Sequence, residues 1–263
     1  MDPIIRIERL SNAFGKKKVL RGIDLEVAPG QILGYIGPNG AGKTTTVKIL
    51  IGMLSSFAGK VTVCGYNVAL HPLKVKQRIG YVPETAALYD TLSAMEFLLF
   101  VGSLHGLDEA LTESRAREML GLLDLDGEMD KRLASFSKGM RQKVLITASL
   151  IHNPDLIIMD EPLSGLDANT AVVVKEILAG LARQGKTVFY CSHVMDVVER
   201  ICDRIVILSG GRIIADGSFE ELQEMSKASS LERLFTQLTS EGIHESTAAR
   251  FIRTFNGGKT AHG

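Results

Sequence analysis

Hydrophobic positions along the chain follow two periods, one typical of strands and one typical of helices. Short apolar runs bounded by turn residues predict buried strands at 31–36, 156–159 and 187–191. Apolar residues at helical spacing predict helices at 45–54, after the first run, and at 168–184, between the other two. A helix of that length usually joins parallel strands, so the pattern predicts a parallel sheet.

Other segments predict antiparallel pairing beside that sheet. Residues 4–10, 23–27 and 59–65 have strand patterns, and the first two suit an antiparallel edge. Residues 204–208 and 212–215 flank a Ser-Gly-Gly turn, which is typical of a hairpin. The sheet is therefore expected to be mixed but mostly parallel.

Residues 86–150 have a different composition, with few β-branched clusters and many Leu, Ala, Met, Glu and Arg residues, which favours helices. Because this region interrupts the strand–helix alternation, we predict an inserted helical subdomain. We expect one domain over 1–220 and a helical tail over 221–263, amphipathic at 231–238. The segment 240–263 contains Gly-Gly-Lys near its end and is predicted to fray.

Composition narrows the class of protein. Of the 263 residues, 45% are hydrophobic and 23% charged, as in ordinary globular proteins. Thirty basic residues balance thirty acidic ones, so no whole-chain field for nucleic acid is expected. No apolar run approaches the ~18 residues that a membrane span needs, so the chain is not expected to cross a bilayer.

Residues 37–44 read GPNGAGKT and match the phosphate-binding loop G-x-x-x-x-G-K-[ST] without a mismatch. Glycines let the backbone N–H groups curl around phosphate, and the next helix points its positive dipole end there. Lys43 is expected to reach the β- and γ-phosphates and Thr44 to bind Mg²⁺. The alternative is a chance glycine-rich turn. The residues expected to contact ATP here are Gly37, Pro38, Asn39, Gly40, Ala41, Gly42, Lys43, Thr44 and Thr45.

Two acids follow the strand at 156–159, at the end where ligands gather in open α/β sheets. Asp160 can hold a metal through water, and Glu161 can polarise an attacking water. A solvated strand end is the alternative. Further upstream, Ser137-Lys138-Gly139 precedes a helix, so Ser137 and nearby N–H groups can form a second anion site or simply cap the helix.

In order and spacing, these residues resemble the nucleotide-binding subunit of an ATP-binding cassette (ABC) transporter. The resemblance covers roughly residues 4–220. Two further matches to the family pattern are Ser-Gly-Leu-Asp at 164–167 and His193. Pattern and resemblance agree on an α/β fold. Its parts are a P-loop NTPase core with a mixed, mostly parallel sheet, an antiparallel β edge subdomain and the helical insertion.

The resemblance implies that two cassettes close face to face, with Ser137 and Gly139 of one capping the ATP held by the other. It implies Glu161 as general base, His193 on the γ-phosphate and Asp167 at the dimer interface. Taken alone, a histidine after a strand also fits an ordinary surface residue. The residues support pairing independently, because two anion sites and one phosphate loop in a chain fit a head-to-tail C2 pair.

Three positions depart from the family pattern. Phe14 takes the place of the usual adenine-stacking Tyr and keeps the ring face. The signature reads Phe-Ser-Lys-Gly-Met at 136–140, which retains Ser137 and Gly139. Glu84 stands for the usual Gln and can bind Mg²⁺. Glu84, Lys-Gly-Met at 138–140 and the tail at 231–235 together resemble the ABC-2 type efflux branch.

We therefore expect an ATPase that uses ATP and Mg²⁺ at the cytoplasmic face of a membrane. It would drive export through a separate membrane-spanning permease, which would dock around residues 84–95. The ATPase would pair with a second cassette as a homodimer or heterodimer, and no nucleic acid partner is expected. One alternative is a soluble cassette ATPase on ribosomes or DNA, which would resemble tandem cassettes or carry long coiled coils. Another is a nucleotide sensor without hydrolysis, against which Lys43, Asp160, Glu161 and His193 argue.

Overall fold

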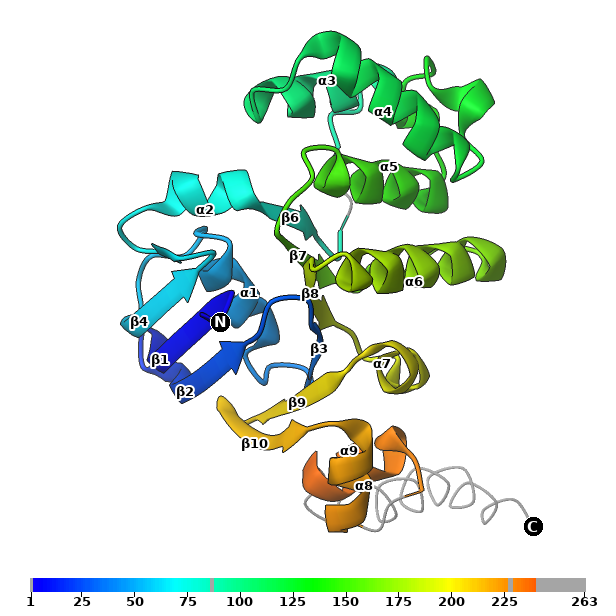
Figure 1. The fold of residues 1–263 in the computed structure, drawn as a ribbon. Coiled ribbons are helices and arrows are strands. Elements are labelled where there is room, and N and C mark those ends of the chain that lie inside the picture. Colours follow the sequence, from blue (N-terminus) through cyan, green and yellow to red (C-terminus); the bar gives the residue numbers. More distant parts are fainter. Residues whose placement is uncertain (1, 86–87, 227–228, 240–263) are drawn as a thin grey trace, which may run out of the picture.

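The larger of two sheets forms the centre of the molecule. A computed structural model describes residues 2–85, 88–226 and 229–239 (Figure 1). The strand order of this six-stranded sheet is β10-β9-β3-β8-β7-β6, and every pair is parallel except β9–β10. Its strands are β3 (Ile32–Ile36), β6 (Ile79–Val82), β7 (Leu156–Asp160), β8 (Thr187–Cys191), β9 (Arg204–Ser209) and β10 (Arg212–Gly217). The predicted mixed sheet and its hairpin are confirmed.

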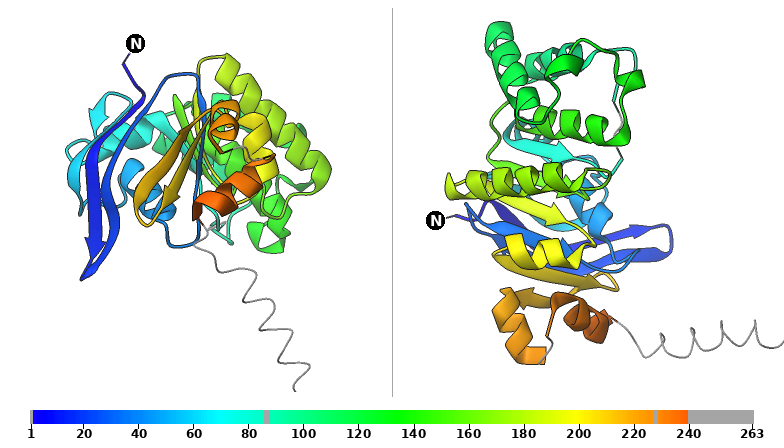
Figure 2. Two further views of the ribbon diagram at one scale, coloured as in Figure 1. Left: turned by 90° about the horizontal axis from the view of Figure 1, so that it is seen from below. Right: turned by 90° about the vertical axis from the view of Figure 1, so that its right-hand side faces the viewer.

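An antiparallel sheet of order β2-β1-β4-β5 packs beside it. Its strands are β1 (Ile5–Phe14), β2 (Lys17–Val27), β4 (Ala58–Val63) and β5 (Tyr66–Asn67). β1 and β2 are longer than predicted and form the extended ribbon at one side of the left view in Figure 2. Register shifts between Ile7 and Leu10, and again between Asn12 and Ala13, break the side-chain alternation of β1. This explains why the sequence pattern located only residues 4–10 and 23–27 of the two strands.

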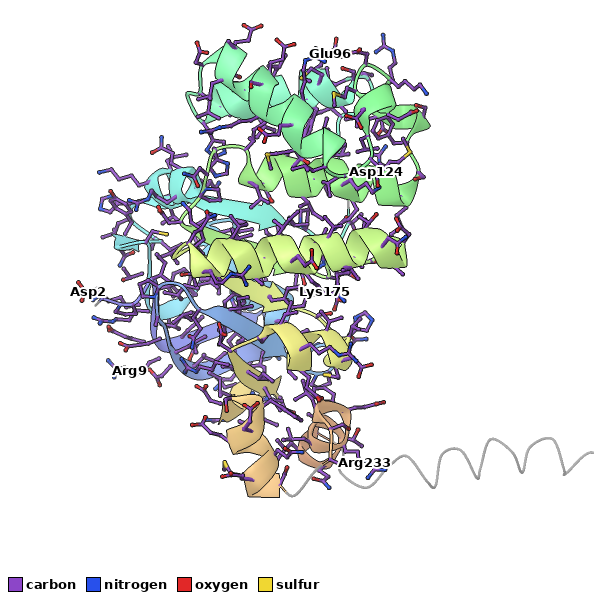
Figure 3. All side chains as sticks on the ribbon, turned by 45° about the vertical axis from the view of Figure 1, so that its right-hand side comes forward. Asp2, Arg9, Glu96, Asp124, Lys175 and Arg233 are labelled. Carbon is purple, nitrogen blue, oxygen red and sulfur yellow. The ribbon has the colours of Figure 1, made fainter. Side chains whose placement is uncertain are left out.

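Helices gather at both ends of the molecule. The described part of the chain has the helices α1 (Lys43–Leu50), α2 (Pro72–Arg78), α3 (Ala94–Leu104), α4 (Glu109–Gly121), α5 (Lys138–Leu150), α6 (Ala168–Arg183), α7 (Met195–Ile201), α8 (Phe219–Ser226) and α9 (Leu231–Thr239). Helices α3–α5 lie at one end, around a core of their own, and α8 and α9 lie at the other (Figure 2). Glu96 of α3 and Arg233 of α9 mark these ends in Figure 3.

The predicted helical region is helical where the structure describes it, with short 3₁₀ turns at Asp126–Glu128 and Leu133–Ser135. Its domain boundaries stay predictions, and residues 240–263, predicted to fray, lie outside the described residues. The helix predicted at 45–54 begins at Lys43 and ends at Leu50. The sequence did not predict α2, β5 or β6, which are too short to show a period.

Buried apolar side chains cover both faces of the large sheet. Because successive side chains of a strand point to opposite faces, Ile158 belongs to the core facing α1, and Ile157 and Met159 belong to the core facing α6. Leu231 and Leu234 of α9 join the second core. Within 2–85, 88–226 and 229–239, no helix has the length and apolar character to cross a bilayer.

Candidate functional site

The carboxyl ends of the parallel strands bring most predicted site residues to one edge of the sheet. The phosphate loop follows β3, Glu84 follows β6, and Asp160 ends β7. Glu161 comes next, and His193 follows β8, the neighbour of both β3 and β7 (Figure 1). This edge is where ligands bind in open α/β sheets.

The phosphate loop curls against the end of the sheet. A Cβ at Gly37 would lie 2.3 Å from the carbonyl oxygen of Leu208, so only glycine allows this approach. Gly42 has a φ of 116°, in the left-handed region, and caps the start of α1. Lys43 Nζ donates to the carbonyl oxygens of Gly37 at 2.6 Å and Pro38 at 3.3 Å. The lysine is thereby folded across its own loop.

A cavity of about 200 Å³ lies on this loop, between it and β2. It is lined by Lys17, Val19, Asn39, Gly40, Gly42, Lys43, Thr44 and Thr45. Phe14, three residues before Lys17, is 55% exposed, so its ring face is available for stacking. A larger cavity of about 600 Å³ between β1, β2 and Arg212 contains none of the predicted residues, and we assign it no role in the reaction.

Asp160 is a buried carboxyl among other charges. Burial raises its pKa to about 6, with further contributions from the negative charges of Glu84 and Glu161, and Lys43 acts in the opposite direction. Glu84 thus lies close enough to influence Asp160, although it sits exposed on the loop after β6. Burying the charged form of a carboxyl group costs free energy, and a bound cation would offset this cost.

Glu161 has a strained backbone, and hydrogen bonds fix the position of its carboxylate. Its φ of 50° is unusual for a residue other than glycine, and such strain is common at functional sites. Oε1 accepts from the backbone N–H of His193 at 2.8 Å and lies 2.7 Å from its Nδ1. Oε2 accepts from the Ser192 hydroxyl at 3.0 Å. Because Oε1 already accepts from the His193 N–H, we assign it as the acceptor here too and place a proton on Nδ1.

Ser137 and Gly139 lie at the start of α5, in contact with the segment after Glu161. Ser137 caps the helix, and its Oγ accepts from the N–H of Met140 at 3.2 Å. Lys138 Nζ donates to Ser164 Oγ at 2.9 Å. A Cβ at Gly139 would be 2.7 Å from the carbonyl oxygen of Gly165, so the two backbones touch.

Asp167 caps α6 at the end of the same segment. Its Oδ1 accepts from the Thr170 N–H at 2.9 Å, and its Oδ2 accepts from the Thr170 hydroxyl at 2.6 Å. These hydrogen bonds lower the pKa of Asp167. No hydrogen bond or ion pair between described residues joins segment 137–139 to the phosphate loop. The predicted residues therefore fall into two groups, which the segment 161–167 connects.

Oxygen donors for a cation come from three segments: the Thr44 hydroxyl and the carboxylates of Asp160 and Glu84. Within the described ranges, no three His, Cys, Asp or Glu side chains are placed to hold a metal by themselves. This donor set fits Mg²⁺, which protein sites usually bind through one or two carboxylates together with substrate phosphates.

Several residues of the site were not predicted from the sequence. Ser192 is buried and orients Glu161, and Gln142 Nε2 donates to the carbonyl oxygen of Pro162 at 3.0 Å. Lys17 and Val19 line the phosphate-loop cavity. Only Ser192 carried a signal, since it stands beside His193 at a strand end; the other contacts depend on tertiary packing.

Comparison with known proteins places the chain in a family. The family model described as "ABC transporter" matches residues 20–164. The chain is 38% identical over 242 residues to the linearmycin resistance ATP-binding protein LnrL of Bacillus subtilis (strain 168), covering 92% of this chain and 76% of the relative. It is 35% identical over 222 residues to the Nod factor export ATP-binding protein I of Cupriavidus metallidurans, covering 84% and 73%.

Structural comparison agrees. A solved structure described as the ATP binding subunit of an ABC transporter has a TM-score of 0.85 and 32% identity, covering 90% of this chain and all of that one. The family match spans more than half of the sequence and includes the phosphate loop, segment 137–139 and Asp160-Glu161. The chain belongs to the ABC transporter family, as an ATP-binding subunit with ATPase activity.

Proposed function

We propose that this subunit powers export through a separate membrane-spanning permease, by ATP-driven closure of a pair of cassettes. Export is supported by the relative named for Nod factor export and by the resemblance of Glu84, segment 138–140 and the 231–235 tail to efflux cassettes. The site of action is the cytoplasmic face of the membrane, with docking around 84–95 and no nucleic acid partner. The observation that carries the hydrolytic role is the contact of Glu161 with His193 at 2.7 Å, beside the phosphate loop.

The phosphate loop holds ATP in this proposal. Its N–H groups and the α1 dipole receive the phosphates, and Lys43 exchanges its two carbonyl acceptors for β- and γ-phosphate oxygens. Phe14 stacks on the adenine. Thr44, Asp160 and Glu84 would hold Mg²⁺, which would supply positive charge to neutralise the phosphates.

Glu161 and His193 act at the γ-phosphate. Glu161 is the general base that orients and polarises the attacking water, and the hydrogen bonds that it accepts from Ser192 and the His193 N–H keep the carboxylate aimed. His193 faces the γ-phosphate through Nε2, because its Nδ1 is engaged by Glu161. Phosphate oxygens accept, so in this role Nε2 carries a proton as well as Nδ1. Lys43 stabilises charge on the transferred group.

The second cassette completes the site. Ser137 and Gly139 have no bond to the phosphate loop of their own chain, and a head-to-tail pair with C2 symmetry brings both segments 137–139 to the opposite loops. The partner is a second copy or a related cassette, and Asp167 lies at the interface. ATP binding closes the pair and hydrolysis reopens it, which moves the permease helices.

Phosphate release from Mg·ATP tests the proposed chemistry. Glu161→Gln should retain ATP binding and lose at least about 100-fold in turnover, since general bases contribute 10²–10⁴. Lys43→Ala should lose ATP affinity, and removal of Mg²⁺ with EDTA should abolish turnover. Wild-type turnover in Glu161→Gln would overturn the role of Glu161. A nucleotide sensor would instead bind ATP and release no phosphate even as the wild-type protein.

A further inference from the structure

Helix α9 lies outside the segment that the family model matches, and the proposed mechanism leaves it without a role. Its apolar face is nevertheless docked firmly. Leu231 and Leu234 are fully buried, in the same core as Val198 of α7 and Ile207 of β9. Figure 1 shows α9 beside α8, at the bottom of the molecule below β10.

A second neighbour of α9 is α7, the helix that begins two residues after His193. On one side α7 packs directly on the backbone of β3, because a Cβ at Gly34 would lie 2.7 Å from Val198 Cγ1. On its other side, Glu199 Oε2 accepts from the N–H of Leu231 at 3.0 Å. A carboxylate at a helix N-terminus is favourable both as a cap and through the dipole. Helix α7 is therefore held between β3 and α9.

A cavity of about 510 Å³ shows what α9 faces. Three segments line it, namely residues 37–39 of the phosphate loop, residues 193–196, and Glu232, Phe235 and Thr236 of α9. The His193 side chain itself is 77% exposed, so little packing holds it apart from its contact with Glu161. The part-buried Phe235 supplies apolar surface where α9 meets the segment that carries this histidine.

We propose that α9 is a positioning element for hydrolysis, in which Glu199 and Phe235 hold the His193 segment in place relative to the phosphate loop. The inference rests on the proposed function, because it takes His193 to act at the γ-phosphate. Neither positioning residue lines the cavity that contains Lys43 and Thr44, which are expected to bind the β- and γ-phosphates and Mg²⁺. Their loss should therefore slow the chemical step and leave nucleotide affinity intact.

The test uses the full chain and four single variants. Glu199→Ala and Phe235→Ala should lower kcat for ATP by roughly 10- to 100-fold, the effect expected from a displacement of about 1 Å. The KM for ATP should stay within about twofold. Glu199→Gln keeps an oxygen acceptor for the Leu231 N–H and should retain most of the activity. Leu238→Ala, on an exposed residue of α9 outside the cavity, is the matched control and should behave as wild type.

A double-variant cycle separates positioning from general destabilisation. In a His193→Ala background, Phe235→Ala should cause no further loss of kcat, because its effect passes through His193. Unchanged kcat in Phe235→Ala and Glu199→Ala, or additive losses in the cycle, would overturn the inference.

Hydrogen–deuterium exchange without nucleotide gives a measurement that needs no activity. Amides of residues 192–198 should exchange faster in Phe235→Ala and Glu199→Ala than in wild type or Leu238→Ala. Equal exchange in all four proteins would overturn the inference. If wild type releases no phosphate from Mg·ATP, the proposed function fails on its own, and this exchange comparison alone decides whether α9 holds the segment.

Discussion

Asp160→Asn should stabilise the nucleotide-free subunit, although it removes a proposed ligand of Mg²⁺. Burial and the negative charges of Glu84 and Glu161 raise the pKa of Asp160 from 3.8 to about 6. The folded protein therefore binds this proton more tightly than the unfolded chain does. Between pH 3.8 and about 6, folding takes up protons, so the stability contributed by this group falls as the pH rises.

The magnitude follows from the two pKa values. At 1.36 kcal/mol for each pKa unit, the ionised carboxylate costs about 3 kcal/mol above pH 6. Asparagine has nearly the same shape and carries no charge, so Asp160→Asn removes this cost. At pH 8 the variant should gain about 3 kcal/mol, or roughly 5–10 °C in melting temperature. At pH 5 the gain should be about half as large, since the wild-type carboxyl is then mostly protonated in the folded state.

Urea unfolding at pH 5 and pH 8, with EDTA present, measures the difference. Asp167→Asn is the control, because hydrogen bonds from Thr170 lower the pKa of that carboxyl and its neutral form should bring no gain. The reasoning is refuted if Asp160→Asn shows the same gain at both pH values, or if it is less stable than wild type at pH 8. The stabilised variant should also lose Mg²⁺-dependent turnover, as expected for a site that sacrifices stability for function.

Three further predictions concern packing around the site. Lys138→Met removes the hydrogen bond to Ser164 and should lower kcat about two- to fivefold, as should Ser164→Ala. In phosphate-release assays, the double variant should be no slower than either single variant. Additive losses would contradict a paired role. Gly139→Ala puts a Cβ 2.7 Å from the Gly165 carbonyl oxygen, so the rate of hydrolysis should fall. The affinity for ATP, measured by titration of the isolated subunit, should be unchanged, and weaker ATP binding would count against this contact. Leu234→Ala should lower the free energy of unfolding by about 2–4 kcal/mol in urea titrations, and a loss below about 1 kcal/mol would mean that α9 contributes little to the core.

The parts of the fold that the sequence predicts well are those in which one short pattern decides the outcome. The strands β7 and β8 are uninterrupted apolar runs, buried along their whole length, and the loop after β3 has a motif with its own backbone chemistry. Parallel strands end at the same edge of a sheet, so the residues that follow these strands in the sequence are also predicted to lie close together. The antiparallel sheet was predicted only in part, since bulges in β1 shift the side-chain alternation.

Contacts that depend on tertiary packing lay beyond the sequence. The contact between Glu161 and His193 occurs with a left-handed backbone at Glu161, which nothing in an Asp-Glu-Pro sequence predicts. The contact of Lys138 with Ser164 joins residues 26 positions apart. The 231–238 stretch is recognisably amphipathic, yet its period does not reveal that α7 is the element its apolar face covers.

The link between the two groups of site residues has a consequence for the proposed pair of cassettes. Gly139 touches Gly165 with no room for an added atom, and Gln142 holds the Pro162 carbonyl from a buried position. A shift of α5 that brings Ser137 onto the partner's ATP must therefore move the segment that begins at Glu161. In the proposed pair, Glu161 acts on the ATP bound by its own chain, so capping at one site would adjust the base at the other. We therefore expect the two sites of such a pair to be coupled mechanically through residues 161–167.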